Sequence, residues 1–373
     1  MGIGRGRLSP THLKIEMTGE HPGSAGLQEA IESRQIEFDR SSRLKHPEER
    51  NAGWTTSSDT DEVNFGNLDL WYYNNVIKFF FREDRKRVDT AAVKRKCNQR
   101  IAAWLTENNR QRAPVAIKAE IKEQVLAELT KNAPVSARIV ELAIDWSEGY
   151  AIVSSQSDSS VDQVIKLLNA TFREIGASFS RLTLKDLAGE KKIEEAKTIE
   201  GVSQILQESI KGPKLLEDLW RTLEDDEIWV EDYKVTMGER AVLSGADATT
   251  TIRGPLNEEE MAAALRDEKS LTSLGLAFTK ADEHDFEMTI AVDKDLILIK
   301  DLIRPPWLEG SDEIGANILI GMSLYWDAFN LVKLLIQWWL QRAQMDETED
   351  APDETGALRD LVKHGQLEVV SLD

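Results

Sequence analysis

The alternation of helical and strand-like spacing between residues 89 and 172 is the feature that most constrains the fold of this chain. Apolar residues recur at helical spacing after Asp89, a good helix N-cap, and again after Pro114, which suits a first helical turn. From 139 to 153 they alternate instead, around a glycine turn, and from 161 to 172 helical spacing returns. This order predicts two helices folded back as a hairpin, then two antiparallel strands and a third helix.

Short strand-like and helix-like segments flank this stretch. Residues 44–61 are polar and turn-rich, and Trp54 within them is expected to cover a sheet as an apolar plug rather than to stack on a ligand. Strand hairpins associated with helices occur twice, which favours an α+β fold with antiparallel sheets. Strands are expected over 11–17, either side of Asn74-Asn75 within 68–81, 234–237, 241–243, 249–253, 274–278, 286–292 and 296–299, and a strand followed by a turn over 179–187. Helices are expected over 27–31, 202–210, 215–223 and 258–266.

Residues 314–340 form the most apolar stretch of the chain and must be tested as a membrane span. Asp327 and Lys333 lie near its middle, where charges are costly in lipid. We therefore expect a strand over Ile318–Met322, a largely buried helix over Tyr325–Arg342, and no membrane association.

The net charge of −20 argues against binding to nucleic acid, but the charges are unevenly distributed. Residues 1–150 carry 23 Lys and Arg against 22 Asp and Glu, whereas residues 151–373 carry 23 against 44. Because salt screens a charge beyond about 10 Å, a locally basic surface in the first half is compatible with phosphate binding. The single cysteine, Cys97, excludes an intrachain disulfide, and the start of the sequence shows no apolar signal core, so a reducing cytoplasm is expected.

The densest run of positive charge lies where the expected second strand of residues 68–81 leads into the first long helix. A solvated charged loop is one interpretation of this run. Its continuation onto the helix favours another, a surface facing phosphate groups, where each cation can neutralise a phosphate and release condensed counterions. The run comprises Lys78, Arg82, Arg85, Lys86 and Arg87, and it continues with Lys94, Arg95, Lys96 and Arg100.

No motif in the sequence indicates catalysis, a cofactor or a bound metal. A Walker-type glycine loop and Cys/His pairs with zinc spacing are absent. Glu283-His284-Asp285 falls in an expected hairpin turn and Glu224–Glu227 at an expected helix end, so both are interpreted as exposed charges. A metal-dependent nuclease would need carboxylates from distant segments, which one sequence cannot show.

Scattered hydrophobic and charged positions across residues 11–343 resemble the RdgC family of bacterial recombination-associated proteins. They form no compact catalytic motif. The positions are Gly53-Trp54, Arg82, Lys86, Lys94, Arg100-Ile101, Lys118, Ile121-Lys122, Val125-Leu126, Leu129, Ile144-Asp145, Gly149, Val153, Leu167-Leu168, Phe172, Leu256, Glu259-Glu260 and the segment 318–340.

This resemblance implies a homodimer that closes into a ring around double-stranded DNA, with a positive inner wall, and that restrains RecA-driven strand exchange. Two departures concern the interfaces: Pro134 stands where family members can have an aromatic residue, and Ile252 takes the place of one of two lysines. By position, the resemblance implies DNA contacts by Arg82, Lys86, Lys94, Arg100, Lys118, Lys122 and Arg253. Together with Lys78, Arg85 and Arg95 from the basic run, these residues are the candidate DNA-binding set.

The expected function is sequence-independent binding of double-stranded DNA by a non-catalytic, nucleoid-associated homodimer without a cofactor. A metal-dependent nuclease on the same scaffold and a protein-interaction scaffold are the alternatives. The acidic tail is expected to compete with DNA for the basic surface. The expected parts are a flexible tail (1–10), a central α+β region (11–88 and 139–212), a helical hairpin (89–138), a gate-like C-terminal α+β region (213–345) and an acidic tail (346–373).

Overall fold

The structure of the chain, a computed structural model, consists of two compact units. Residues Glu16–Glu148 with Asp158–Phe179 are called the hairpin unit, and Met1–Ile15, Gly149–Ser157 and Ser180–Asp373 the six-stranded unit. The expected helix over 202–210, the Glu283–Asp285 run and the tail beyond Asp346 lie outside the described residues. The structure describes residues 9–19, 22–56, 63–188, 212–246, 248–254, 256, 258–267, 269–280, 286–293, 296–303 and 314–346.

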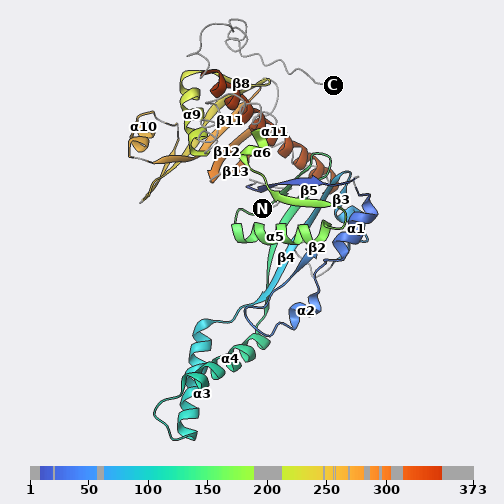
Figure 1. Ribbon diagram of the computed structural model, residues 1–373, viewed down its shortest axis with the longest axis vertical. Helices are drawn as coiled ribbons and strands as arrows, with labels where there is room; N and C mark the ends of the chain where they lie inside the picture. The colour runs from blue at the N-terminus through green and yellow to red at the C-terminus, as the bar shows by residue number, and fades with distance from the viewer. Residues whose placement is uncertain are drawn as a thin grey trace. The chain divides into compact units, whose positions relative to one another are not determined.

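The strands form two antiparallel sheets accompanied by helices, so the fold is α+β as predicted (Figure 1). The first sheet has the order β2-β4-β5-β6-β1-β7 with β3 beside β4, and the second has the order β10-β9-β11-β12-β13 with β8 beside β9. The strands are β1 Thr11–Met17, β2 Asn51–Thr55, β3 Tyr72–Tyr73, β4 Val76–Lys86, β5 Val135–Asp145, β6 Tyr150–Val153, β7 Ala177–Arg181, β8 Ile228–Val230, β9 Tyr233–Ser244, β10 Thr249–Arg253, β11 Ser270–Thr279, β12 Phe286–Asp293 and β13 Leu296–Ile303. The helices are α1 Ser24–Glu32, α2 Phe38–Ser42, α3 Thr90–Glu107, α4 Val115–Asn132, α5 Asp158–Phe172, α6 Leu184–Ala188, α9 Gly212–Asp225, α10 Glu258–Arg266 and α11 Ile314–Asp346, with the 3₁₀ helix η1 at Leu68–Leu70.

Two long strands are the frame of the hairpin unit. β4 and β5 pair over their full length, from Val76 opposite Asp145 to Lys86 opposite Val135. Trp54 on β2 is fully buried and donates a hydrogen bond from Nε1 to Thr171 Oγ1 on α5, at 2.7 Å. Trp54 is therefore a core residue of this unit, as its setting in the sequence predicts.

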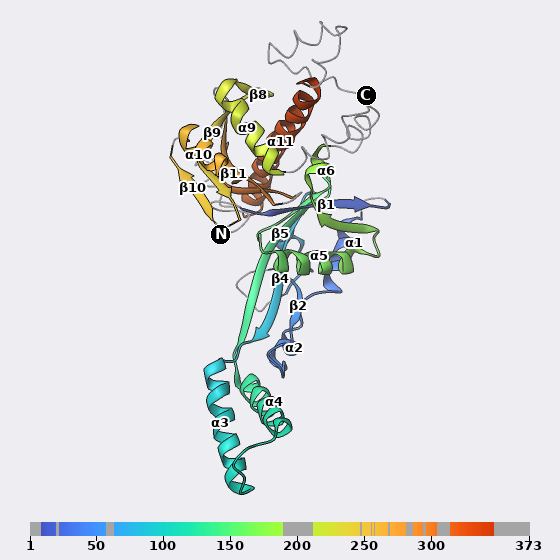
Figure 2. The same cartoon turned by 60° about the vertical axis from the view of Figure 1, so that its left-hand side comes forward.

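The helices α3 and α4 form the predicted hairpin beyond the ends of β4 and β5 (Figures 1 and 2). The carboxylate of Asp89 caps α3 by accepting hydrogen bonds from the backbone amides of Ala91 and Ala92. α3 has no buried residue, and α4 has only Ile121, Val125 and Thr130. The hairpin therefore has a thin core and leaves much of both helices exposed.

The six-stranded unit buries its apolar side chains between the second sheet and its helices. α9 packs against β11, and α11 against α6 and β8. On β1 of the same unit, His12 is fully buried, stacks on Phe329 and hydrogen-bonds through Nε2 to the Tyr325 hydroxyl of α11. Burial lowers the pKa of His12 to about 3, so its imidazole is neutral in the folded protein.

The expected strand over Ile318–Met322 is wrong, because α11 runs without a break from Ile314 to Asp346. Ile318, Met322, Tyr325 and Phe329 are buried and recur at steps of three and four residues, so helical periodicity continues through the short alternating run. Among the described residues, Ile318–Trp339 is the one helical segment long and apolar enough to cross a membrane, and 61% of its apolar window is buried inside the protein.

Two other strands differ from expectation because pairing outweighs local composition. The polar, turn-rich stretch 44–61 contains β2, which pairs with β4 from Asn51 opposite Asp84 to Thr55 opposite Phe80. The segments 234–237 and 241–243, predicted as separate strands, belong to the single strand β9, which follows the long neighbouring strand β11 with two register shifts.

Candidate nucleic-acid interface

The candidate cations on β4 are mostly held by contacts within the protein. Lys78 forms an ion pair with Glu141 on β5 at 2.7 Å. The guanidinium of Arg82 is almost fully buried, and its Nε donates to Asp84 at 2.8 Å. Lys86 is buried too. Its Nζ donates to the backbone carbonyls of Ser42 at 2.9 Å and Lys131 at 3.3 Å.

Glu83, which lies between these cations in the sequence, is also neutralised by contacts within the protein. Glu83 is buried and lies 3.1 Å from Arg138 of β5 and 4.0 Å from Arg50. The half-buried Arg85 forms no ion pair with any described residue. The densest positive run of the sequence is therefore largely an internal charge network that joins β4 to β5 and to the loops beside it.

On the hairpin itself, one acid holds two cations. Glu128 of α4 forms ion pairs with Lys96 and with Arg100, the latter at 2.5 Å. The hydrogen bond from Lys96 is the largest cause that lowers the pKa of Glu128, and the charge of Arg100 adds to it. Arg100, predicted to contact DNA, is thus partly neutralised by a neighbour on α4.

Three candidate lysines come together along a groove of about 580 Å³ between α3 and α4. Lys94 comes from α3, and Lys118 and Lys122 come from α4. All three are exposed, and none forms an ion pair with a described residue. We call this feature the lysine groove; its other lining residues are Val88, Thr90, Val93, Cys97, Asn98 and Ile101 of the α3 region, Leu126 of α4, and His46, Pro47 and Glu48.

The sequence could not show how the groove is completed. Its apolar lining comes from positions that helical spacing assigns to the contact between α3 and α4, and they are only half-buried. The loop residues 46–48 carry no local signal of a site. They reach the groove because β2, which follows them, pairs with β4 next to the start of α3.

The two remaining candidates lie elsewhere. Arg95 is exposed on α3 but does not line the groove. Arg253 is exposed at the end of β10 in the six-stranded unit, opposite Arg240 of β9. The structure therefore groups Lys94, Lys118 and Lys122 but not the whole predicted set.

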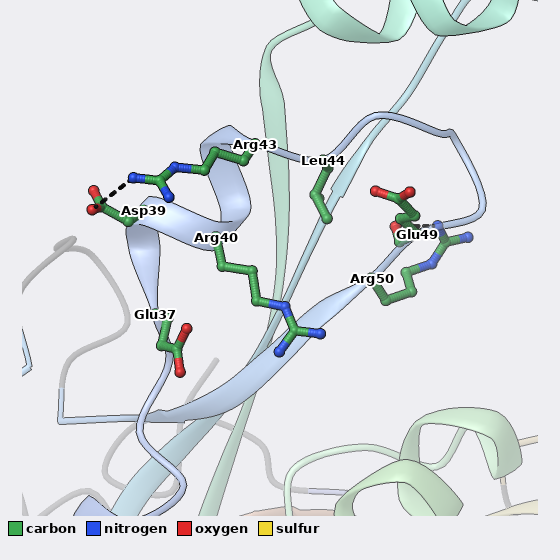
Figure 3. Close-up of a pocket in the computed structure, with 7 residues that line it drawn as sticks. All are labelled: Glu37, Asp39, Arg40, Arg43, Leu44, Glu49 and Arg50. Atoms are coloured by element: carbon green, nitrogen blue, oxygen red, sulfur yellow. Dashed lines mark hydrogen bonds and ion pairs between the residues drawn. The ribbon is translucent and has the colours of Figure 1, made fainter.

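A second pocket, of about 620 Å³, lies beside α2 and has mixed charge (Figure 3). Arg43 pairs with Asp39 at 3.5 Å, and Arg50 donates to the carbonyl of Pro47 at 2.6 Å. Cations and anions in its lining are equal in number, so the pocket has no excess positive charge to attract phosphate. Its lining residues, none of which was predicted as a site, are Glu37, Asp39, Arg40, Arg43, Leu44, Glu49 and Arg50.

Within the described ranges, no group of three or more His, Cys, Asp or Glu side chains is placed so that it could hold a metal ion. Cys97 is a free thiol that is partly accessible at the lysine groove. What the described site offers chemically is three unneutralised ammonium groups beside an apolar surface.

Comparison with known families agrees with the resemblance seen in the sequence. The family model described as "Putative exonuclease, RdgC" matches residues 26–192, which include the lysine groove and every candidate cation except Arg253. No curated protein matches the chain. The family match supports, broadly, a DNA-related function associated with recombination. Residues 26–192, less than half of the chain, are thus similar to the RdgC family.

Proposed function

We propose that this protein binds double-stranded DNA without sequence preference, through the lysine groove of the α3–α4 hairpin. The observation that carries the proposal is that Lys94, Lys118 and Lys122 are exposed in one groove and have no acidic partner among the described residues. An ammonium group is a point charge that neutralises a phosphate and releases its counterions. Phosphate contacts carry no sequence information, so such binding is blind to base order.

The internal charge network on β4 reduces the number of cations that are available for contact with DNA. Lys78, Arg82 and Lys86 would have to break contacts with Glu141, Asp84 and backbone carbonyls before binding phosphate. The buried Arg82 in particular would leave Asp84 as an uncompensated charge. We therefore assign DNA contact to the groove lysines and to exposed Arg95, and a structural role to these three β4 cations.

The salt dependence of DNA affinity tests this assignment. Each lysine that neutralises a phosphate contributes about 0.9 to the slope of log K against log salt. The triple variant Lys94→Gln/Lys118→Gln/Lys122→Gln should therefore lower the magnitude of the slope by about 2 to 3, measured by fluorescence anisotropy with a labelled duplex across a salt series.

The matched control is Lys166→Gln, which removes an exposed lysine of α5 that does not line the groove. The slope of log K against log salt for this control should differ by less than about 1 from that of the unmodified protein, since at most one peripheral charge is lost. If the triple variant keeps the original slope while its circular dichroism is unchanged, the DNA site lies elsewhere.

The same proposal includes a homodimer that closes around DNA and restrains RecA-driven strand exchange, a role that would place the protein on the nucleoid. Its support is the match of residues 26–192 to the RdgC family model and the exposed hairpin. A ring predicts that closed-circular DNA is retained at a salt concentration at which linear DNA slides off. Sedimentation should give the mass of two 42.0-kDa chains, and the protein should slow strand exchange by RecA. A monomer that releases both DNA forms alike contradicts the ring.

A nuclease is the second candidate, favoured by the description of the matching family as an exonuclease. End-labelled linear duplex incubated with the protein and Mg²⁺ or Mn²⁺ tests it. Progressive loss of label, abolished by chelation, would show a metal-dependent exonuclease. Retention of intact DNA under the same conditions supports the binding function alone.

A further inference from the structure

The turn between α3 and α4 carries two arginines that have no partner among the described residues. Residues 108–114, called the interhelical turn, follow the 18-residue helix α3 at the end of the hairpin away from β4 and β5 (Figures 1 and 2). Arg110 and Arg112 are exposed, and neither forms an ion pair or a side-chain hydrogen bond with a described residue. No acidic residue occurs from Asn108 to Lys118. The interhelical turn is therefore a positively charged end of the hairpin.

Hydrogen bonds hold the backbone of this turn in one conformation. Asn109 has a positive φ of 48°, and its amide donates to the carbonyl of Thr106 at 3.3 Å. The amide of Arg110 donates to the carbonyl of Leu105 at 3.0 Å. These two bonds are those of a Schellman motif, in which a left-handed residue ends a helix. Because the backbone is already ordered, a ligand needs to fix only the side chains of the two arginines.

Apolar surface lies beside the two arginines and leads to the lysine groove. Pro114, which ends the turn, is exposed, and Val115, which begins α4, is 83% exposed. Val115, Lys118 and Lys122 are spaced by three and four residues, so they follow one another along one face of α4. From Val115 to Lys122 this face is about 10 Å long. One short stretch of duplex can therefore contact both the turn and the groove lysines.

This combination of side chains suits the minor groove of DNA. The minor groove of B-DNA is about 6 Å wide, which is too narrow for a helix but open to a chain arm or a long side chain. Arginine enters this groove where it is narrow, because narrowing strengthens the negative potential and because a guanidinium is less strongly hydrated than an ammonium. Proteins that bind there combine such cations with exposed apolar side chains. A contact with phosphate alone would use the arginines but not Val115.

We propose that the interhelical turn enters the minor groove of the duplex that the lysine groove holds. Arg110 and Arg112 lie along the floor of the minor groove, and Val115 contacts the sugars of its wall. The inference rests on the proposed function, because contacts of the groove lysines with phosphate bring the turn to DNA. It adds a preference for A·T-rich DNA, whose minor groove is narrower and lacks the 2-amino group of guanine.

Three duplexes of equal length, built of A·T, G·C or inosine·cytosine pairs, test this preference. An inosine·cytosine pair presents the major-groove groups of G·C but lacks the guanine 2-amino group in the minor groove. In anisotropy titrations at one salt concentration, the A·T and inosine duplexes should bind about fivefold more tightly than the G·C duplex. Equal affinity for all three duplexes, or an inosine duplex that binds like the G·C duplex, would overturn the proposal.

The variant Arg110→Lys/Arg112→Lys separates the guanidinium groups from their charge. It keeps every positive charge, so the slope of log K against log salt should change by less than about 1. The preference for A·T over G·C should fall from about fivefold to less than about twofold, because an ammonium keeps its hydration. The control Arg173→Lys, which replaces an exposed arginine directly after α5, should keep the preference. An undiminished preference in the double variant would overturn the role of the two arginines.

Val115→Ser tests the apolar contact. It should lower the affinity for the A·T duplex about threefold at every salt concentration, because salt does not screen the burial of an apolar group. The control is Ala119→Ser, which changes an exposed residue of α4 that does not line the lysine groove and should leave the affinity unchanged. Equal affinities of the two serine variants would overturn the contact of Val115 with the sugars.

The same titrations distinguish failure of this inference from failure of the proposed function. If the groove lysines determine the salt slope but the three duplexes bind equally, the turn stays outside the minor groove and the proposed function stands. If no duplex is bound, both are wrong. If Lys94→Gln/Lys118→Gln/Lys122→Gln keeps the original slope and the A·T preference, the lysine groove is not the DNA site and only the role of the turn is retained.

Discussion

For individual residues, the decisive question is which charges are neutralised inside the fold. Arg82 and Lys94 look equivalent in the sequence, as members of one basic run. Arg82 is 9% exposed and paired with Asp84, whereas Lys94 is exposed in the lysine groove. A buried charge must keep its partner because the low local dielectric penalises an uncompensated ion. Buried, paired charges such as Arg82 and Asp84 therefore contribute to the stability of the fold, and this contribution can be measured.

Asp84→Asn should lower the free energy of unfolding of the hairpin unit by about 3 kcal/mol, because it removes the carboxylate from a buried ion pair. Asp84 is fully buried and accepts from Arg82 at 2.8 Å and from Ser41 Oγ at 2.6 Å. Urea unfolding is the measurement. The exposed Asp39 pairs with Arg43, so Asp39→Asn should cost less than about 1 kcal/mol. Equal losses in the two variants would contradict the assignment.

His12 should make the six-stranded unit sensitive to acid. Its pKa is about 3 in the fold against an ordinary value of 6.5, so below 6.5 the unfolded chain binds a proton that the folded chain does not. This contribution to stability is complete above the unfolded value and falls as the pH drops toward 3. Between about pH 7 and pH 5 the loss is about 2 kcal/mol. The measurement is the difference between the unfolding free energies at pH 7 and at pH 5. This difference should be smaller by that amount in His12→Asn than in the unmodified protein. An unchanged difference would contradict burial of a neutral imidazole.

Among the secondary-structure elements, β2 shows how close backbone approach places a loop against the sheet. Gly53 lies opposite Arg82 of β4, and a Cβ built on it would stand 2.6 Å from both the backbone nitrogen and the Cα of Ile36. The backbone amide of Ile36 also donates to the carbonyl of Trp54 at 3.0 Å. Only glycine allows this approach, which fixes the segment before α2 against β2.

Gly53→Ala should destabilise the hairpin unit by about 1 to 3 kcal/mol, since the added methyl group meets backbone that cannot rotate away. Gly66→Ala is the control, because a Cβ there would meet only the side chain of Asn64, at 3.6 Å. It should change stability by less than about 0.5 kcal/mol. Thermal unfolding followed by circular dichroism gives both values, and a neutral Gly53→Ala variant would show that β2 can shift.

For the chain taken together, each of the two compact units buries apolar side chains of its own. Leu142 on β5 belongs to the hairpin unit, Leu274 on β11 belongs to the six-stranded unit, and both are fully buried. Parts of a protein that open in separate reactions respond independently to substitution, because each opening exposes its own apolar surface.

Leu274→Ala should cost about 3 kcal/mol and speed hydrogen exchange in β9, β11 and β12 while leaving β4 nearly unchanged. Leu142→Ala should have the reverse effect. Native-state hydrogen exchange measured by mass spectrometry resolves the two sets of peptides. Uniform acceleration throughout the chain in either variant would show one cooperative core instead of two.

Local pattern was enough to predict most of the elements. The N-cap at Asp89, the hairpin of α3 and α4, the Asn74 and Gly149 turns and the helix α5 all follow from spacing and turn chemistry within a few residues, and Asn74 and Gly149 have the positive φ values that such turns need. The prediction failed at Ile318–Met322, where a short alternating pattern competes with helical periodicity. It also failed at β2, whose strand conformation depends on pairing with β4 and not on its own composition.

Which cations remain available for a ligand depended on the tertiary structure alone. The partners that neutralise Lys78, Glu83 and Arg100 are Glu141, Arg138 and Glu128, which lie far from them in sequence and reach them through the pairing of β4 with β5 and the packing of α3 on α4. Charge pairing acts over a few ångströms in space, whereas periodicity acts along the chain. The amino-acid order therefore predicted the helical hairpin and its lysines. The fold left Lys94, Lys118 and Lys122 available together, because most of the other candidate DNA-binding cations have a partner within the protein.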